Sequence, residues 1–76
     1  MSPRLPALKP REVIRALERA GFFFHHSTGS HRYFKHPDNP GALVTVPYHS
    51  RDLKRGTLAG IIKQAGLTLE GFLELL

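Results

Sequence analysis

The stretch Ser27-Thr28-Gly29-Ser30-His31-Arg32-Tyr33-Phe34 decides the fold, because it places a glycine turn directly before a run of strand-forming residues. Glycine takes the positive φ that a tight turn needs, or lies close against a ligand. His31 stands at the mouth of the predicted strand, and histidine gives or takes a proton near neutral pH. The stretch therefore predicts a strand that opens on a candidate catalytic histidine. A surface strand with an incidental histidine is the alternative.

Polar and cationic side chains surround this histidine. Ser30 precedes it, and Arg32, Tyr33 and Lys35 follow within the same strand. A phosphodiester substrate needs positive charge for the phosphate and a flat face for an unstacked base. Ser30, Arg32 and Lys35 are therefore candidate RNA contacts.

The charge of the chain is strongly positive. The formal net charge is +5 and the sequence pI is about 10.3. Between His25 and Arg55 the only acidic residues are Asp38 and Asp52, so the middle of the chain predicts an electropositive face. Such a face attracts polyanions, although basicity alone also fits a domain that is merely soluble.

The length and the composition limit the class of protein. A chain of 76 residues predicts one domain, 1–76, with residues 1–9 as an N-terminal arm. Cysteine is absent, which excludes disulfides and thiolate metal sites and leaves packing as the source of stability. The arm carries no apolar run of the kind found in signal peptides or membrane spans. We therefore expect a cytoplasmic protein that does not contact the membrane.

The first half of the chain predicts a helix and two strands. The helix covers Pro10–Ala20, with proline at its first position and Gly21 as a left-handed cap. Phe22–His26 predicts a strand at the centre of the sheet, and period-two alternation puts Phe22, Phe24 and His26 on one face. The second strand covers Ser30–His36.

The second half predicts a strand and two further helices. After the turn signal Pro37–Gly41, Ala42–Val46 forms the third strand, which Pro47 closes. A basic loop, Tyr48–Gly56, leads to a helix that Thr57 caps. Its predicted core positions share helical spacing, and they are Leu58, Ile61, Ile62 and Ala65. A short last helix starts at Thr68, and its apolar residues Phe72, Leu73, Leu75 and Leu76 either close the core or bind a partner.

This order of elements predicts an α+β fold, αβββα with a short C-terminal helix. Both main helices cover one face of a three-stranded antiparallel meander. The other face is free, and on a basic protein a nucleic acid can lie there.

At this point a family resemblance emerges from motifs spread along the chain. Gly29-Ser30-His31 opens a strand, Val46-Pro47-Tyr48-His49 ends another, and two helical motifs follow, Leu53-Lys54-Arg55-Gly56-Thr57-Leu58 and Ile61-Ile62-Lys63-Gln64-Ala65-Gly66-Leu67. In this order and spacing they resemble the HicA family of mRNA interferase toxins, over about Arg11 to Leu73.

The resemblance implies a fold like that of double-stranded-RNA-binding domains and a toxin of a type II toxin–antitoxin system. It also implies cleavage of mRNA without the ribosome and neutralisation by a HicB-type antitoxin. The catalytic histidine of the family's Gly-Ser-His position falls on His31. Two features depart from the family pattern: the arm before Pro10 is longer, and His25-His26 is an uncommon pair in the first strand.

The chemistry of RNA cleavage suggests a role for each polar residue. A ribonuclease needs a group that deprotonates the 2′-hydroxyl or protonates the leaving 5′-oxygen, and we assign this role to His31. His49 either supplies the second proton-transfer group or contacts a phosphate. Lys54 and Arg55 either neutralise the charge developing on phosphorus or anchor phosphates.

Metal catalysis is the rival chemistry that five histidines suggest. Period two puts His31 and His36 on opposite faces of a strand, and no His-x-x-x-His helix pair or carboxylate cluster accompanies them. We therefore expect no metal site and no small-molecule cofactor. A metal-independent endoribonuclease, a non-catalytic RNA-binding module and, more weakly, a protein-binding domain that uses the C-terminal helix remain as function classes.

Overall fold

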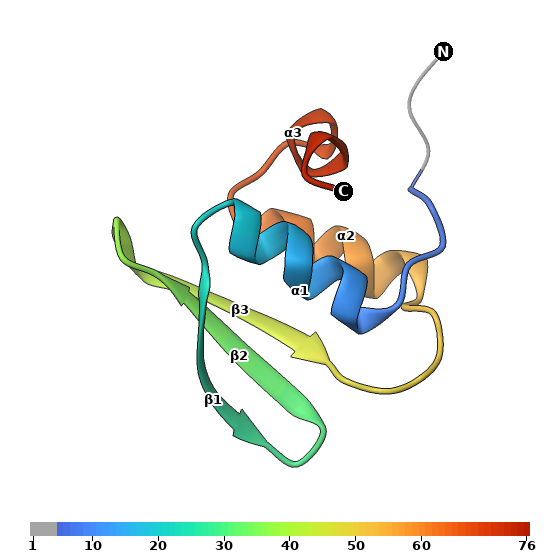
Figure 1. Cartoon of the computed structure of the whole chain (residues 1–76), viewed down its shortest axis with the longest axis horizontal. Helices are drawn as coiled ribbons and strands as arrows, with labels where there is room; N and C mark the ends of the chain where they lie inside the picture. The colour runs from blue at the N-terminus through green and yellow to red at the C-terminus, as the bar shows by residue number, and fades with distance from the viewer. Residues whose placement is uncertain (1–4) are drawn as a thin grey trace.

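The computed structural model describes residues 5–76 and has an αβββαα order of elements (Figure 1). The helices and strands are α1 (Pro10–Arg19), β1 (Phe23–Thr28), β2 (His31–His36), β3 (Asn39–Pro47), α2 (Arg55–Gln64) and α3 (Leu69–Glu74). The strands form one antiparallel sheet in the order β1-β2-β3. This α+β layout is consistent with a double-stranded-RNA-binding-domain-like fold, so the predicted fold class is confirmed.

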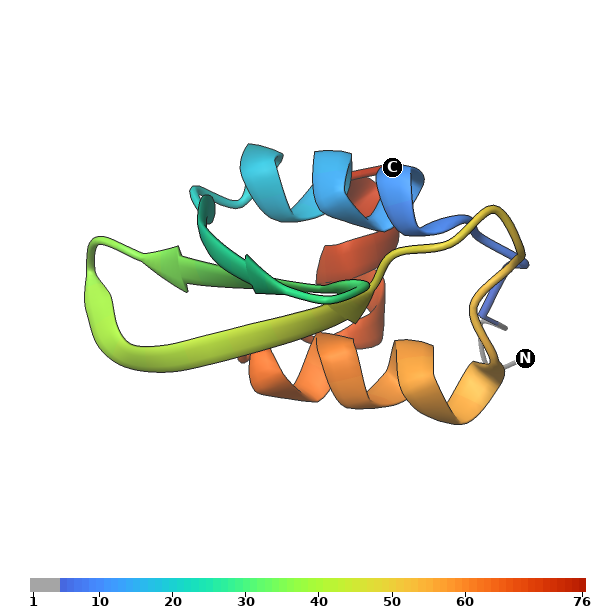
Figure 2. The same ribbon diagram turned by 90° about the horizontal axis from the view of Figure 1, so that it is seen from below.

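Both main helices lie on the same side of the sheet. Figure 1 shows α1 and α2 above the strands, and Figure 2, seen from below, shows the strands between these two helices with α3 behind them. Phe34, Val44 and Val46 point toward the helices and are buried. They meet buried residues of the three helices, namely Val13, Ala16, Leu17, Leu58, Ile61, Ile62 and Phe72. No helix of residues 5–76 covers the opposite face of the sheet.

Helix α1 begins at Pro10 as predicted and ends at Arg19, one residue before the predicted end. Pro10 occupies the first helical turn, and the backbone N–H of Lys9 donates to Oε1 of Glu12 at 3.0 Å. Ala20 is the C-terminal cap, and Gly21 follows with a φ of 97°. This positive φ suits glycine because it has no Cβ to clash with the backbone.

The position of the first strand was predicted wrongly. The strand order puts β2 at the centre of the sheet and β1 at an edge. Short connections join β1 to β2 and β2 to β3, so the middle strand in sequence is also the middle strand in space. The aromatic run is exposed along β1, and only Phe22, just before the strand, is buried.

The predicted alternation within this strand also fails, at His26. The register between β1 and β2 is interrupted between Phe24 and His26. Phe24 pairs with Phe34, but His26 pairs with Tyr33, the neighbour of Phe34 on the opposite face. A bulge inserts one unpaired residue, which reverses the faces of all later residues in the strand.

Strand β3 begins earlier than predicted. It covers Asn39–Pro47, whereas the sequence predicts Ala42–Val46, so the turn after β2 is confined to Pro37 and Asp38. Pro40 lies within the strand, where proline usually interrupts pairing. Edge strands and bulges tolerate it, and β3 is an edge strand whose pairing with β2 is irregular at this end.

Helix α2 also starts earlier than predicted. Lys54 is its N-cap and Arg55 its first residue, so Thr57 lies inside the helix instead of capping it. Leu53 is buried and its N–H donates to the carbonyl of Leu8 at 2.8 Å. This anchor fixes the chain directly before Lys54, and the helix can therefore begin there. Leu58, Ile61 and Ile62 are buried as predicted, and Ala65 is half-buried.

Helix α3 lies beyond α1 and α2, away from the sheet (Figure 1). Thr68 caps it as predicted, because its Oγ1 accepts the N–H of Gly71 at 3.0 Å. Phe72 is fully buried, whereas Leu73 and Leu75 are half-buried and Leu76 is 45% exposed. Core closure therefore falls mainly to Phe72.

The end of the N-terminal arm packs against the rest of the domain. In residues 5–9 of the predicted arm, Leu5 packs against the core and Leu8 is buried. Residues 1–4, which carry the rest of the arm, lie outside the described residues. Among residues 5–76, the helices are too short and too polar to cross a membrane.

Candidate nucleic-acid interface

The Gly-Ser-His triplet forms one corner of the sheet. Gly29 and Ser30 make a two-residue turn between Thr28 and His31, which pair with each other. Gly29 has a φ of 57°, as a tight hairpin turn with glycine at its first central position requires. The carbonyl of Ser30 accepts the N–H of Tyr48 at 2.7 Å. The turn is therefore fixed to the chain where β3 ends.

His31 is exposed and begins β2 opposite Pro47 of β3. Alternation from the buried Phe34 puts its side chain on the uncovered face of the sheet. Within residues 5–76, every other histidine makes a hydrogen bond through a ring nitrogen; these are His25, His26, His36 and His49. In that part of the chain, His31 is the histidine with both ring nitrogens free of internal hydrogen bonds.

Arg32 is separated from His31 by the sheet itself. It points toward the helix side, and its guanidinium carbon lies 3.6 Å from the centroid of the Tyr48 ring. A cation over an aromatic face is held by the ring quadrupole. Arg32 thus contacts Tyr48 on the helix side of the sheet. His31, the adjacent residue, lies on the uncovered face.

Lys35 shares the uncovered face with His31 but lies four residues along β2, about 13 Å away at the usual rise per residue. Between them Tyr33 stacks on His26, with ring centroids 4.4 Å apart and an angle of 5° between the planes. The bulge in β1 creates this aromatic pair, and sequence reasoning missed it. The His26 ring therefore covers one face of the Tyr33 ring.

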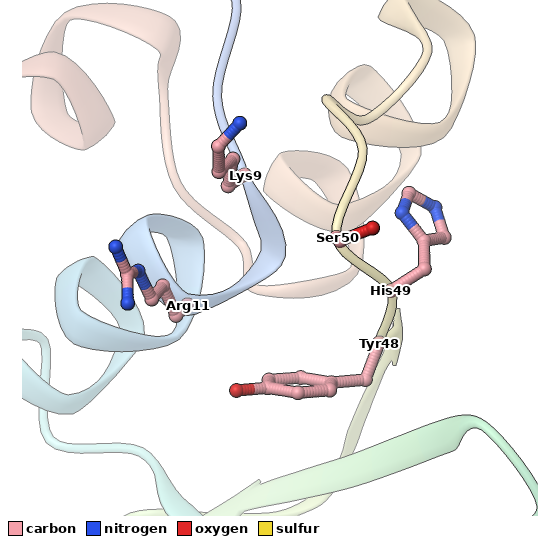
Figure 3. A pocket seen from close by; sticks show the side chains of 5 residues that line it. All are labelled: Lys9, Arg11, Tyr48, His49 and Ser50. Carbon is pink, nitrogen blue, oxygen red and sulfur yellow. The ribbon is translucent and has the colours of Figure 1, made fainter.

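His49 lies in the loop of residues 48–54 that joins β3 to α2. Its Nδ1 accepts the N–H of Arg51 at 3.1 Å, so in the neutral ring Nε2 carries the hydrogen. Figure 3 shows His49 directed away from the Tyr48 ring. The exposed His49 can therefore donate a proton or a hydrogen bond through Nε2.

Lys54 and Arg55 are exposed at the start of α2 instead of within the loop. Residues 48–53 separate them from the end of β3. The structure therefore does not gather all the predicted contacts at one point. Ser30 and His31 form one corner with Tyr48, whereas Lys35 and the Lys54–Arg55 pair are phosphate-binding candidates at a distance.

Most cations are free to meet an anion. In the described part of the chain, the one ion pair joins Nζ of Lys9 to Asp52 at 3.8 Å, with both side chains about half exposed. Within residues 5–76, no acidic side chain forms an ion pair with the cations of β2 or of α2. Among the same residues, no three histidine or acidic side chains converge in a group that could hold a metal ion.

Tyr48 is the functional candidate that the sequence reading passed over. Its ring lines a cavity together with Lys9, Arg11, His49 and Ser50 (Figure 3). The sequence contained one signal: an aromatic residue directly follows the proline that ends a strand. No sequence pattern indicated that Tyr48 would lie in one cavity with Arg11, because the two residues are far apart along the chain.

Comparison with known proteins identifies the family. Residues 10–67 match the family described as "HicA toxin of bacterial toxin-antitoxin" systems, which covers most of the 76 residues. The matched region includes β1 to β3, the corner at His31 and both main helices. Among curated proteins, no match is found. The extent of the family match confirms the resemblance, and this chain belongs to the HicA family of toxins of bacterial toxin–antitoxin systems.

Proposed function

We propose that this toxin is a metal-independent endoribonuclease that cleaves mRNA, with His31 as its catalytic residue. Membership of the HicA family supports a nuclease activity in general. The observation that carries the finer proposal is the state of His31. It is exposed at a sheet corner, and it is the histidine in residues 5–76 whose ring makes no internal hydrogen bond.

The proposed reaction uses the nucleophile that RNA itself carries. The 2′-oxygen loses its proton and attacks the adjacent phosphorus, and the bond from phosphorus to the 5′-oxygen breaks. The 5′-oxygen takes up a proton, which leaves a 2′,3′-cyclic phosphate and a 5′-hydroxyl end. The His31 imidazole serves as base or acid in these transfers. His49, which holds its hydrogen on the exposed Nε2 in the neutral ring, is the candidate partner.

The remaining candidate contacts serve binding in this proposal. Ser30 and Lys35 hold the strand on either side of the reacting phosphate, and Arg32 acts through Tyr48. Lys54 and Arg55 anchor phosphates beyond the loop. Their free positive charges complement RNA, and release of counterions from the RNA makes such binding depend on salt. An mRNA substrate implies that the protein works in the cytoplasm.

The proposed partner is a HicB-type antitoxin that covers the corner at His31. An acidic protein suits the net charge of +5, and complementary charge accelerates association. Occlusion of His31 would stop cleavage without any change in the fold of the toxin.

The decisive experiment separates cleavage from binding. We expect RNA cleavage to continue in the presence of chelator and to stop at a bond whose 2′-hydroxyl is replaced by hydrogen. His31→Ala is expected to lose about 10²-fold or more in rate, with a change in stability within about 0.5 kcal/mol because the side chain is exposed. His25→Ala, which removes another exposed imidazole, is the matched control and should cleave normally.

A non-catalytic RNA-binding module is the second candidate function, because fold and charge support binding without chemistry. It predicts tight binding of both RNA and the 2′-deoxy analogue and no cleavage of either. Full activity of His31→Ala would reject His31 and make His49 the next residue to test. Cleavage at the 2′-deoxy position would instead require attack by water.

A further inference from the structure

A second candidate site, apart from the corner at His31, is the cavity beside the loop that follows β3. It measures about 440 Å³ and is lined by Lys9, Arg11, Tyr48, His49 and Ser50 (Figure 3). Cavities that bind small ligands fall in the range of about 300–1,000 Å³. The cavity can therefore hold a group of the size of one nucleotide.

The Tyr48 ring gives this cavity a flat apolar wall. Arg32 covers one face of the ring at 3.6 Å and does not line the cavity, whereas Arg11 does. The ring face that meets the cavity is therefore free. The Arg32 contact holds the ring, and the hydrogen bond from the Tyr48 N–H to the Ser30 carbonyl holds the backbone that carries it. A fixed aromatic face loses little freedom when a base stacks on it.

Two cations stand on the other side of the same cavity. Arg11 is exposed, and in residues 5–76 no acidic side chain pairs with it. Lys9 has one long contact to Asp52 at 3.8 Å, with the two side chains 48% and 53% exposed. Exposed pairs of this kind contribute little free energy, so a phosphate can compete for Lys9. An aromatic face opposite two cations is the combination that single-stranded nucleic acids bind.

The cavity lies next to the candidate catalytic corner. The backbone of Tyr48 bonds to Ser30, and Pro47 pairs with His31. Tyr48 and His31 therefore stand at the same end of the sheet, on opposite faces. A strand of RNA that passes around this end can place one nucleotide at each.

We propose that this cavity is a nucleotide-binding subsite, in which a base stacks on Tyr48 and its phosphate binds Arg11 and Lys9. The subsite holds a nucleotide of single-stranded RNA beside the bond to be cleaved. Its place next to the scissile bond rests on the proposed function, but nucleotide binding itself does not.

The test uses tyrosine fluorescence, because the chain has two tyrosines and no tryptophan. In Tyr33→Phe, Tyr48 is the remaining emitter, and adenosine 5′-monophosphate should quench it in a saturable way. In Tyr48→Phe, the emission of Tyr33 should show no saturable quenching, which controls for absorption by the nucleotide. Adenosine and ribose 5-phosphate, which each lack half of the ligand, should bind at least about 10-fold more weakly. Equal quenching in the two variants would overturn the proposal.

Nucleotide affinities of variants, measured by calorimetry, distinguish the contribution of the Tyr48 ring from that of the cations. Tyr48→Leu should weaken nucleotide binding by about 5- to 150-fold, the range for loss of one stacked base, and Tyr48→Phe should bind normally. Arg11→Gln should also weaken it, whereas Arg15→Gln, on the same helix but outside the cavity, should not. Equal affinity in Tyr48→Leu and Tyr48→Phe would show that the ring does not stack.

Failure of the subsite and failure of the proposed function give different results. Nucleotide binding should persist in His31→Ala, because His31 faces the other side of the sheet. In the active enzyme, Arg11→Gln should raise the KM for RNA with a smaller effect on kcat. Unchanged KM together with lost nucleotide binding would place the cavity outside the path of the substrate. Nucleotide binding by a protein that never cleaves RNA would uphold the cavity and reject the nuclease.

Discussion

Replacement of Gly21 by alanine should destabilise the fold by far more than its single added methyl suggests. Gly21 has a φ of 97°, and an alanine in a left-handed conformation costs about 1–2 kcal/mol. A Cβ built at Gly21 would also lie 2.6 Å from Nε2 of His36, so the ring must move. That ring is hydrogen-bonded to the Ala20 carbonyl at 2.9 Å and packs edge-on against Phe22.

The two contributions together give the expected magnitude. A lost hydrogen bond costs about 0.5–1.5 kcal/mol, and partial loss of the aromatic contact adds up to about 1 kcal/mol. With the backbone cost, Gly21→Ala should lose about 2–4 kcal/mol of unfolding free energy. For a chain of this length, such a loss lowers Tm by about 10–30 °C.

Two other glycines of the chain supply matched controls. Gly29 has a φ of 57° but no atom within 4 Å of the added Cβ, so Gly29→Ala should show only the backbone cost of about 1–2 kcal/mol. Gly60 lies within α2 with no atom near its Cβ, and Gly60→Ala should stabilise the protein by about 0.5–1 kcal/mol. The series thus separates backbone strain from the steric clash.

Urea denaturation followed by circular dichroism measures each unfolding free energy, and equal m-values confirm that the variants share one unfolding transition. A double-mutant cycle with His36→Ala tests the cause directly. Without the ring, Gly21→Ala should cost no more than Gly29→Ala. Equal costs for Gly21→Ala and Gly29→Ala in the parent protein would refute the role of the His36 clash.

Three further outcomes test other parts of the molecule. Replacing both Lys54 and Arg55 with alanine should reduce the slope of log affinity for RNA against log salt by about 1–1.5, because two phosphate contacts are lost; an unchanged slope removes the pair from the interface. Binding of the antitoxin should protect the segment around His31 in hydrogen exchange, and protection confined to α3 would contradict inhibition by occlusion. Phe72→Ala should lose about 3–5 kcal/mol of unfolding free energy, because this ring is fully buried; a loss below about 1 kcal/mol, measured by urea denaturation, would show that α3 is not part of the core.

The sequence by itself determined the features that depend on neighbouring residues. Gly21 and Gly29 have the positive φ that their places after a helix and inside a hairpin turn predict. Thr68 caps α3, and the helical spacing of Leu58 and Ile61 identifies the buried face of α2. Each of these follows from backbone conformation or side-chain period within one short segment, which local composition specifies. The ordered motifs around His31 were likewise sufficient to identify the family.

Only the tertiary structure decided which elements meet. The bulge in β1 pairs His26 with Tyr33, so that their rings stack. The sequence of one strand does not specify where its register with the neighbouring strand shifts by one residue. The hydrogen bond from Leu53 to Leu8 anchors the chain just before α2, which therefore begins before Thr57. The same packing puts the Tyr48 ring against Arg32 and in one cavity with Arg11, residues of a strand and a helix far apart in sequence. Register and loop position depend on contacts between distant segments, and such contacts exist only after the sheet and helices have packed together.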